Sequence, residues 1–283
     1  MLLMLRNSLK SWGAYIKGSF SISMDAKMNE ENKDKRHYVL VHGAWCWYKL
    51  KPQLQSSGNK VTVLDFAASG INPKRIEDVG NFAEYSEPLL ELLESLPPSE
   101  KVVLVGNSFG GLSLALAMDK FPHKIALAVF VAAFVPDTQH PPSCILDEHA
   151  ERNQTNGNGM LDNELPPSGS LTLFGPNFLR KNLYQLCFSE DLELANTLVR
   201  PCSLFLEELR KAKSFSKEGY GSVPVAYIVC KEDLAIPVEF QKWMVQSACI
   251  HEIVEITDAD HMPMLSNTYQ LCLDLLHLVN KYT

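Results

Sequence analysis

The sequence contains no long hydrophobic run, no paired-cysteine motif and no excess of positive charge. No stretch of about 18 uninterrupted apolar residues occurs, so we expect no transmembrane helix. The seven cysteines are scattered without a C-x-x-C pair, which argues against a zinc site and a disulfide framework. The net charge of −7 argues against nucleic acid or an anionic membrane as the main partner. Free thiols fit a reducing compartment, and we expect a cytoplasmic location.

The first 36 residues differ in composition from the rest of the chain. Between Met1 and Met24 there are basic residues and many serines but no Asp or Glu, as in a chloroplast or mitochondrial transit peptide. Residues 25–36 are a charged, polar linker. The alternative is that the chain starts at Met24 or Met28 and the leader has no role. Residues 1–36 are therefore assigned to an N-terminal extension (transit peptide or non-native leader), with chloroplast import through residues 1–24 as the alternative location.

From Tyr38 onward, short apolar runs alternate with amphipathic segments. The run at 101–105 is almost continuously apolar, which is typical of a strand buried on both faces of a parallel sheet. The alternation predicts an α/β architecture, with a mostly parallel sheet and helices on both faces. The predicted strands lie at 38–41, 60–65, 101–105, 125–134, 225–229 and 252–256. The predicted helices lie at 47–54, 82–96, 112–121, 240–247 and 268–281.

The alternation stops near Pro136 and resumes near Val223. The insert between them, about residues 137–222, has two Pro-Pro pairs, a polar stretch and three helical segments, at 178–186, 191–199 and 204–212. A helical insert in the second half of such a sheet predicts a cap over the functional site. Residues 37–283 are thus one domain, with the cap inserted after the fourth predicted strand.

A possible nucleophile follows the third predicted strand. Residues 106–110 read Gly-Asn-Ser-Phe-Gly and match the G-x-S-x-G pattern, between a buried strand and a helix. This context predicts a tight turn that lifts the Ser108 hydroxyl above the carboxyl edge of the sheet. The N-terminus of the following helix would point its N–H groups at the same place, where an oxyanion can be held.

A serine nucleophile needs a base, and in this fold the order along the chain is Ser, acid, His. Two histidines, His251 and His261, lie between the cap and the last helix. His251 begins a predicted strand and is expected at the surface. His261 lies in the loop between the last strand and the last helix, which can reach over the sheet edge to Ser108.

The acid should follow the preceding strand. Glu232 and Asp233 both do, and spacing alone does not separate them. Asp258 and Asp260 are rivals, but they are too close to the histidine in sequence to reach its far nitrogen easily, and are expected to be loop carboxylates. Asp137, just after the fourth strand, is an outside candidate.

Residues 38–282 resemble the plant methylesterase branch of the α/β-hydrolases. That branch includes the salicylic-acid-binding methyl esterases, polyneuridine aldehyde esterase and the α-hydroxynitrile lyases. The resemblance is carried by several segments that are more specific than the serine motif alone. These are 39–43 (VLVHG), 45–52 (WCWYKLKP), 67–73 (AASGINP), 85–89 (YSEPL), 200–205 (RPCSLF), 220–223 (YGSV) and 238–243 (VEFQKW).

The resemblance implies a Ser-His-Asp triad in an α/β-hydrolase fold. Ser108 would be the nucleophile, Asp233 rather than Glu232 the acid, and His261 the base. The backbone N–H groups of Phe109 and Ala44 would be the oxyanion donors. No cofactor and no metal are implied, the partner would be a small-molecule ester, and a homodimer is compatible with the family.

Two positions favour ester hydrolysis over cyanohydrin cleavage. The lyases of this family carry a lysine directly after the catalytic histidine, where this chain has Met262, and a threonine where it has Gly43. The expected function is therefore hydrolysis of the methyl ester of a small plant metabolite. This could be a hormone ester such as methyl salicylate or methyl jasmonate, or an indole-alkaloid aldehyde ester whose acid then loses CO₂.

The chain also departs from the family pattern. The loop after Gly43 is shorter than in family members, and Asn107 stands before the serine where the esterases usually have histidine. Because loss of one oxyanion donor can cost roughly 10²–10³ in rate, a weakly catalytic or non-catalytic binding protein is the alternative function. A hydroxynitrile lyase ranks behind it.

Overall fold

The structure is a computed structural model that describes residues 35–155, 162–163 and 171–282. Residues 36–283 make up one compact unit of the chain. The proposed transit segment, residues 1–24, lies outside the described residues, as does much of the polar stretch of the cap.

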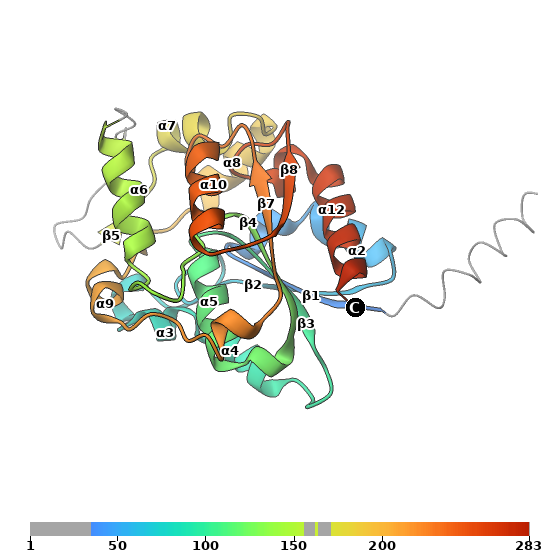
Figure 1. Cartoon of the computed structure of the whole chain (residues 1–283). Coiled ribbons are helices and arrows are strands. Elements are labelled where there is room, and N and C mark those ends of the chain that lie inside the picture. The colour runs from blue at the N-terminus through green and yellow to red at the C-terminus, as the bar shows by residue number, and fades with distance from the viewer. Residues whose placement is uncertain (1–34, 156–161, 164–170, 283) are drawn as a thin grey trace, which may run out of the picture. The chain divides into compact units, whose positions relative to one another are not determined.

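A single six-stranded parallel sheet organises the domain (Figure 1). The strand order is β2-β1-β3-β4-β7-β8, and all five neighbouring pairs are parallel. The strands are β1 (His37–Val41), β2 (Lys60–Leu64), β3 (Val102–Ser108), β4 (Ile125–Ala133), β7 (Val225–Cys230) and β8 (Glu252–Ile256). The predicted α/β-hydrolase architecture is confirmed. The third strand extends beyond the predicted end and includes the candidate nucleophile.

Helices cover both faces of the sheet, and this explains the continuous apolar runs in its strands. On β1, Tyr38 and Leu40 pack in a cluster with residues of α2 (Leu50–Ser56) and α12 (Thr268–Lys281). Val39 and Val41 pack in a second cluster, on the other face. Its helical members come from α4 (Glu87–Ser95), α5 (Gly110–Lys120) and α10 (Val238–Ser247). Successive residues point to opposite faces of a strand, so a strand covered on both faces needs apolar residues at every position.

Two predicted helices are divided in the structure. The segment 82–96 forms α3 (Phe82–Tyr85) and α4, which meet at Ser86. Pro88 lies in the first turn of α4, where its missing N–H costs nothing, so it starts a new helix. The predicted helix at 47–54 is a 3₁₀ turn, η1 (Ala44–Trp47), followed by α2.

In the described residues between β4 and β7, helical elements outnumber strands. The helical elements are α6 (Cys144–Thr155), α7 (Pro176–Phe178), η4 (Leu179–Leu183), α8 (Ser189–Leu198), α9 (Leu206–Lys211) and η5 (Tyr220–Ser222). Two short strands, β5 (Leu171–Thr172) and β6 (Cys202–Ser203), pair antiparallel. Helix α6 was not predicted, because its apolar residues gather at its start and its second half is polar. The remaining short elements are η2 (Ile76–Asp78), η3 (Pro122–Lys124) and α11 (Pro263–Ser266).

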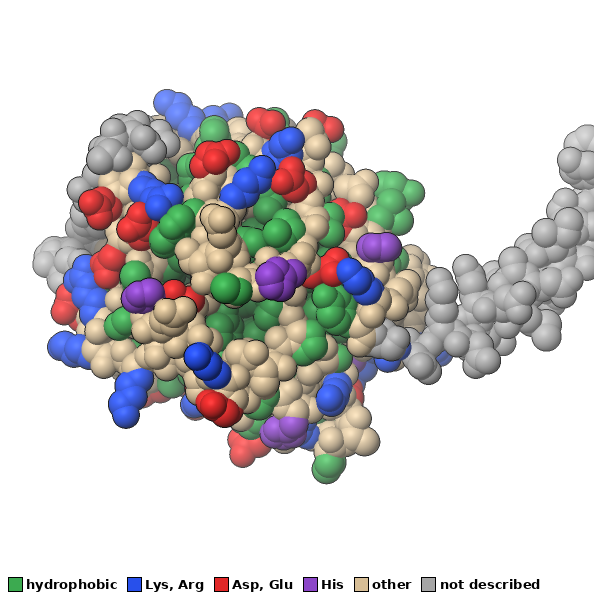
Figure 2. Space-filling model, viewed as in Figure 1, with side chains coloured by type: hydrophobic (Ala, Val, Ile, Leu, Met, Phe, Trp, Pro, Cys, Tyr) green, Lys and Arg blue, Asp and Glu red, His purple; other side chains and the backbone are tan. Residues whose placement is uncertain are grey.

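Among the described residues, no helix has the length and apolar character needed to cross a membrane. Figure 2 shows that side chains of both charge signs are interspersed over the face of the molecule seen in Figure 1.

Candidate active site

The candidate residues lie at the carboxyl ends of the strands. The chain runs from β1 to β2 on one side and returns to place β3 on the other side of β1. In an open parallel sheet, ligands bind at such a switch point, outside the carboxyl ends of the strands. Ser108 ends β3, Asp233 follows β7 and His261 follows β8, so all three belong to this edge.

Ser108 occupies a sharp turn between β3 and α5. Its φ of 54° lies in the left-handed region, which is strained for a residue with a side chain. Gly106 permits the close approach of the helix, since a Cβ there would lie 2.7 Å from Cδ1 of Leu114. The carbonyl of Ser108 accepts a hydrogen bond of 3.0 Å from the N–H of Phe134, just after β4. The side chain of Ser108 stays partly exposed.

His261 and Asp233 form a buried pair. The Nδ1 atom of His261 lies 2.8 Å from Oδ2 of Asp233, and the two residues are 3% and 2% exposed. A carboxylate only accepts, so Nδ1 carries the proton and donates it. In the neutral imidazole, Nε2 of His261 then carries the lone pair that a general base needs.

The carboxylate of Asp233 is held in one orientation by its own loop. Its Oδ1 atom accepts the N–H groups of Ala235 and Ile236, each at 2.8 Å. The buried amide of Gln241, on α10, donates to the carbonyls of Cys230 and Ile236 on either side of this loop. Sequence reasoning did not single out Gln241. The available signal was a polar residue beside the apolar face of a helix.

Asn107 connects β3 to the loop of the candidate base. Its Nδ2 atom donates to the carbonyl of Val131, on β4, at 2.9 Å and to the carbonyl of His261 at 3.0 Å. The residue is fully buried, and its Oδ1 atom has no hydrogen-bond partner among the described residues. The side chain therefore acts as a donor between two strand ends.

Most of the rival residues do not join this site. Glu232, Asp258 and His251 are exposed. Asp137 pairs with His140, whose Nδ1 atom lies 2.7 Å from Oδ2 of the aspartate. The structure therefore separates Asp233 from Glu232, which spacing alone had left equivalent.

Asp260 is buried, but its carboxylate accepts hydrogen bonds from surrounding groups, mainly backbone N–H groups. Its carboxylate accepts the N–H of Met262, the hydroxyl of Ser266 and the N–H of Leu186, which lies between η4 and α8. These bonds tie the cap segment to the loop of His261. The expectation that Asp260 is a loop carboxylate agrees with these contacts.

The two residues expected to donate to an oxyanion differ in their surroundings. The backbone of Phe109 precedes α5, at the turn that carries Ser108. The N–H of Ala44 donates to Oδ1 of Asp65 at 2.6 Å. The N–H that was expected to face an oxyanion is therefore engaged, in this structure, with the carboxylate that follows β2.

Two further imidazoles lie close to the candidate triad. His42, directly after β1, has φ of 91°. Burial, and then the charge of His261, lower the pKa of His42 to about 4. His149, on α6, donates from Nε2 to the carbonyl of Ala235 at 2.7 Å, and burial lowers its pKa as well. Sequence reasoning missed both histidines in this region.

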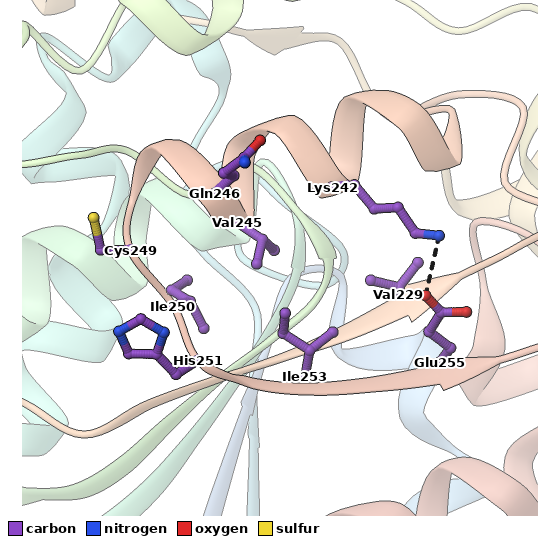
Figure 3. Close-up of a pocket in the computed structure, with 9 residues that line it drawn as sticks. All are labelled: Val229, Lys242, Val245, Gln246, Cys249, Ile250, His251, Ile253 and Glu255. Atoms are coloured by element: carbon purple, nitrogen blue, oxygen red, sulfur yellow. Dashed lines mark ion pairs between the residues drawn. The ribbon is translucent and has the colours of Figure 1, made fainter.

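A surface hollow of about 440 Å³ lies between α10 and β8 (Figure 3). Apolar residues such as Val245, Ile250 and Ile253 line it, with an ion pair of 3.1 Å between Lys242 and Glu255. None of the three candidate triad residues lines this hollow. It is therefore separate from the site at the strand ends.

The described part of the chain contains no group of three or more His, Cys, Asp or Glu that could hold a metal ion.

Comparison with known proteins agrees with this geometry. Residues 38–274 match the α/β hydrolase family. The chain is 51% identical over 260 residues to salicylic acid-binding protein 2 of Nicotiana tabacum, an alignment that covers 88% of this chain and 99% of the relative. The chain belongs to the plant methylesterase family of α/β-hydrolases.

Other relatives support this membership. Methylesterase 1 of Arabidopsis thaliana is 50% identical over 262 residues, covering 89% of this chain and 99% of the relative. The crystal structure of polyneuridine aldehyde esterase superposes with a TM-score of 0.82 at 47% identity, covering 87% of this chain and 99% of that one. These three relatives thus share about half of their aligned residues with this chain, and polyneuridine aldehyde esterase also shares its fold.

Proposed function

We propose that this chain is a serine carboxylesterase that hydrolyses the methyl ester of a small plant metabolite. The observation that carries the proposal is the buried hydrogen bond between His261 and Asp233, at the same sheet edge as the Ser108 turn. The bond sets the tautomer of the histidine, and the turn presents the serine hydroxyl. Together these are the parts of a nucleophile–base–acid triad.

The reaction follows from these groups in two stages. Nε2 of His261 accepts the proton of the Ser108 hydroxyl as the serine oxygen attacks the ester carbonyl. The N–H of Phe109 stabilises the resulting oxyanion, helped by the positive end of α5. His261 returns the proton to the leaving methoxide, and methanol departs from an acyl-enzyme. Water activated by His261 then attacks the acyl group and restores Ser108.

The family members support a methyl ester as the substrate. Their names include methylesterase and polyneuridine aldehyde esterase, at 48–51% identity to this chain. Met262 follows the candidate base and cannot supply a cation for a cyanide leaving group, and Gly43 lacks the hydroxyl of the threonine that the resemblance places there in the lyases. Small hormone esters and alkaloid aldehyde esters are therefore the substrates to test first.

The test is methanol release by the purified protein over a panel of methyl esters. The panel should contain methyl salicylate, methyl jasmonate, methyl indole-acetate and an alkaloid aldehyde ester, with Ser108→Ala as the matched control. We expect release from at least one ester that is abolished in the variant. Release that persists in Ser108→Ala would contradict the proposed nucleophile.

A binding protein with weak turnover is the second candidate. The specific observation in its favour is that Asp65 engages the Ala44 N–H, so that Phe109 is left as the main oxyanion donor. This candidate predicts that a carboxylate or ester ligand binds equally well to the protein and to Ser108→Ala, without methanol release. Isothermal titration calorimetry on both forms separates the two candidates.

We also propose a cytoplasmic location and a homodimeric state. All seven cysteines are free, which fits a reducing compartment. N-terminal sequencing of the protein isolated from plant tissue tests import through residues 1–24, because import would remove Met1. Sedimentation equilibrium tests the dimer.

A further inference from the structure

The loops that follow β1 and β2 are joined by one carboxylate. These strands are parallel neighbours, with Val41 opposite Leu64, so their carboxyl ends lie side by side. Asp65 follows Leu64 directly. Its Oδ1 atom accepts the N–H of Ala44 at 2.6 Å, and its Oδ2 atom accepts the N–H of Ile71 at 3.1 Å. Both carboxylate oxygens of Asp65 therefore accept hydrogen bonds from backbone N–H groups of the two loops.

The second of these loops closes around the carboxylate and is fixed by the cap. A Cβ on Gly70, whose φ is 50°, would lie only 2.2 Å from Oδ1 of Asp65, so the glycine backbone packs directly against it. Arg200, between α8 and β6, donates to the carbonyls of Gly70, Asn72 and Lys74 at 3.3, 2.5 and 2.6 Å. Asp65 is thus held by a loop that Arg200 fixes in turn.

An N–H that donates to a carboxylate is poorly suited to receive a second anion. The bond from Ala44 is short and charge-assisted, which makes it stronger than a bond between neutral groups. An oxyanion at the same N–H would have to displace the carboxylate and would be repelled by its charge. That charge acts on the loop already, since it adds to burial in raising the pKa of the Cys46 thiol.

We propose that Asp65 withholds the Ala44 N–H from the oxyanion site and so limits the rate of ester hydrolysis by this chain. The inference rests on the proposed esterase function. Asp65 is a positioning residue here, because it acts on the oxyanion through the backbone of Ala44. The Phe109 N–H is then the main donor to the oxyanion formed at Ser108.

The test compares kcat and KM of Asp65→Ala and Asp65→Asn with the unaltered protein, using p-nitrophenyl acetate and the best methyl ester of the panel. A freed donor stabilises the transition state and not the bound ester. One oxyanion donor is worth roughly 10²–10³ in rate, so we expect kcat to rise at least about tenfold in Asp65→Ala, with KM unchanged. Asp65→Asn keeps an acceptor oxygen without the charge, and a smaller rise is expected. Asp78→Ala, an exposed carboxylate in η2, is the matched control and should change neither constant.

An unchanged or lower kcat in both Asp65 variants would overturn the inference. Should Asp65→Ala fail to fold, an unchanged kcat in Asp65→Asn alone overturns it. A fluorophosphonate that labels Ser108 separates this failure from that of the proposed function. If Ser108 is labelled and kcat rises in neither Asp65 variant, the proposed role of Asp65 is refuted but the esterase function is not. Unlabelled Ser108 with no ester hydrolysis in any form refutes the esterase and the inference together.

Discussion

The side chain of Asn107 donates a hydrogen bond of 3.0 Å to the backbone carbonyl of His261. Asn107 immediately precedes the candidate nucleophile, so the residue next to Ser108 holds the loop of the candidate base. The second bond, to Val131 on β4, fixes the same amide to the sheet. The separation of nucleophile and base therefore depends on a side chain that need not touch substrate.

Replacing this amide should lower activity and stability together. Asn107→Ala leaves the carbonyls of Val131 and His261 without their donor, and each unsatisfied buried group costs about 1–3 kcal/mol. We expect the free energy of unfolding to fall by about 2–6 kcal/mol on this basis. A misplaced base can lower kcat by roughly 10². Urea unfolding and steady-state kinetics measure the two effects.

Asn107→Asp sharpens this test, because it keeps the shape and removes the donor. A carboxylate would face two carbonyl oxygens in a buried site, so the aspartate variant should be less stable than the alanine variant. An aspartate variant as stable as the unaltered protein would show that the amide is not a donor here.

His149 should link the cap to the candidate acid. Its Nε2 donates to the carbonyl of Ala235, whose N–H donates to Asp233, and the imidazole lies between Phe134 and Phe240 at 5.1 Å from each ring. In His149→Leu the carbonyl loses its donor and the loop of Asp233 loosens. We expect kcat to fall by roughly tenfold, a fraction of the loss that misplaced groups can cause.

His149→Gln is the matched control for this prediction. The glutamine amide keeps a donor of similar reach, so kcat should stay close to that of the unaltered protein. Equal losses in both variants would point to packing between the aromatic rings rather than to the hydrogen bond.

Asp191 should anchor the cap to the segment that follows β1. This aspartate of α8 is 1% exposed and accepts from the Tyr48 hydroxyl and the Lys49 ammonium, each at 2.6 Å. Lys49→Met leaves the buried carboxylate with Tyr48 alone. Breaking a buried ion pair in this way costs about 3–5 kcal/mol. Because Lys49 is itself partly exposed, we expect the free energy of unfolding to fall by about 3 kcal/mol, the lower end of this range.

The double variant Lys49→Met with Asp191→Leu provides the check. It removes both charges, so urea unfolding should show much of the lost stability restored. If the double variant loses as much unfolding free energy as the two single variants together, the two residues do not stabilise each other.

The stability of the domain should fall as the pH is lowered from 6.5 toward 4. Burial is the main cause that lowers the pKa of His42, His149 and His37, to about 4 for His42. In this window the unfolded chain binds more protons than the folded one, so protons favour unfolding. The stabilisation is fully present above pH 6.5 and is lost as the pH falls through the lowered pKa values.

Urea unfolding at pH 7.0, 5.5 and 4.5 measures this dependence. We expect a lower midpoint at each step, and a shallower dependence in His42→Asn, which removes one of the three titrating groups. An identical pH dependence in His42→Asn would contradict the lowered pKa of that histidine.

The sheet was predictable because its signal is local. The short run at 102–105 is continuously apolar and the segment 252–256 is rich in Ile and Val, and both lie in strands of the structure. Helix α6 escaped prediction for the opposite reason. Only its first turn carries buried apolar residues, Ile145 and Leu146, and the rest is polar. The later contacts of α6 are made by polar side chains such as His149, which packs against Phe134 and Phe240, so the helix shows no periodic apolar pattern.

The sequence alone determined the α/β-hydrolase architecture and the residue types of a serine esterase, since strand periodicity, the serine turn and family motifs are local features. Spacing left Glu232 and Asp233 equivalent, and only the resemblance to the family favoured Asp233. The tertiary structure gives the physical reason, because Glu232 is exposed whereas Asp233 is buried and meets His261. It alone decided the partner of the Ala44 N–H. Asp65 lies 21 residues away along the chain, and the parallel pairing of β1 and β2 brings the two together. Contacts between strand ends depend on the order of strands in the sheet, which no single segment of sequence encodes.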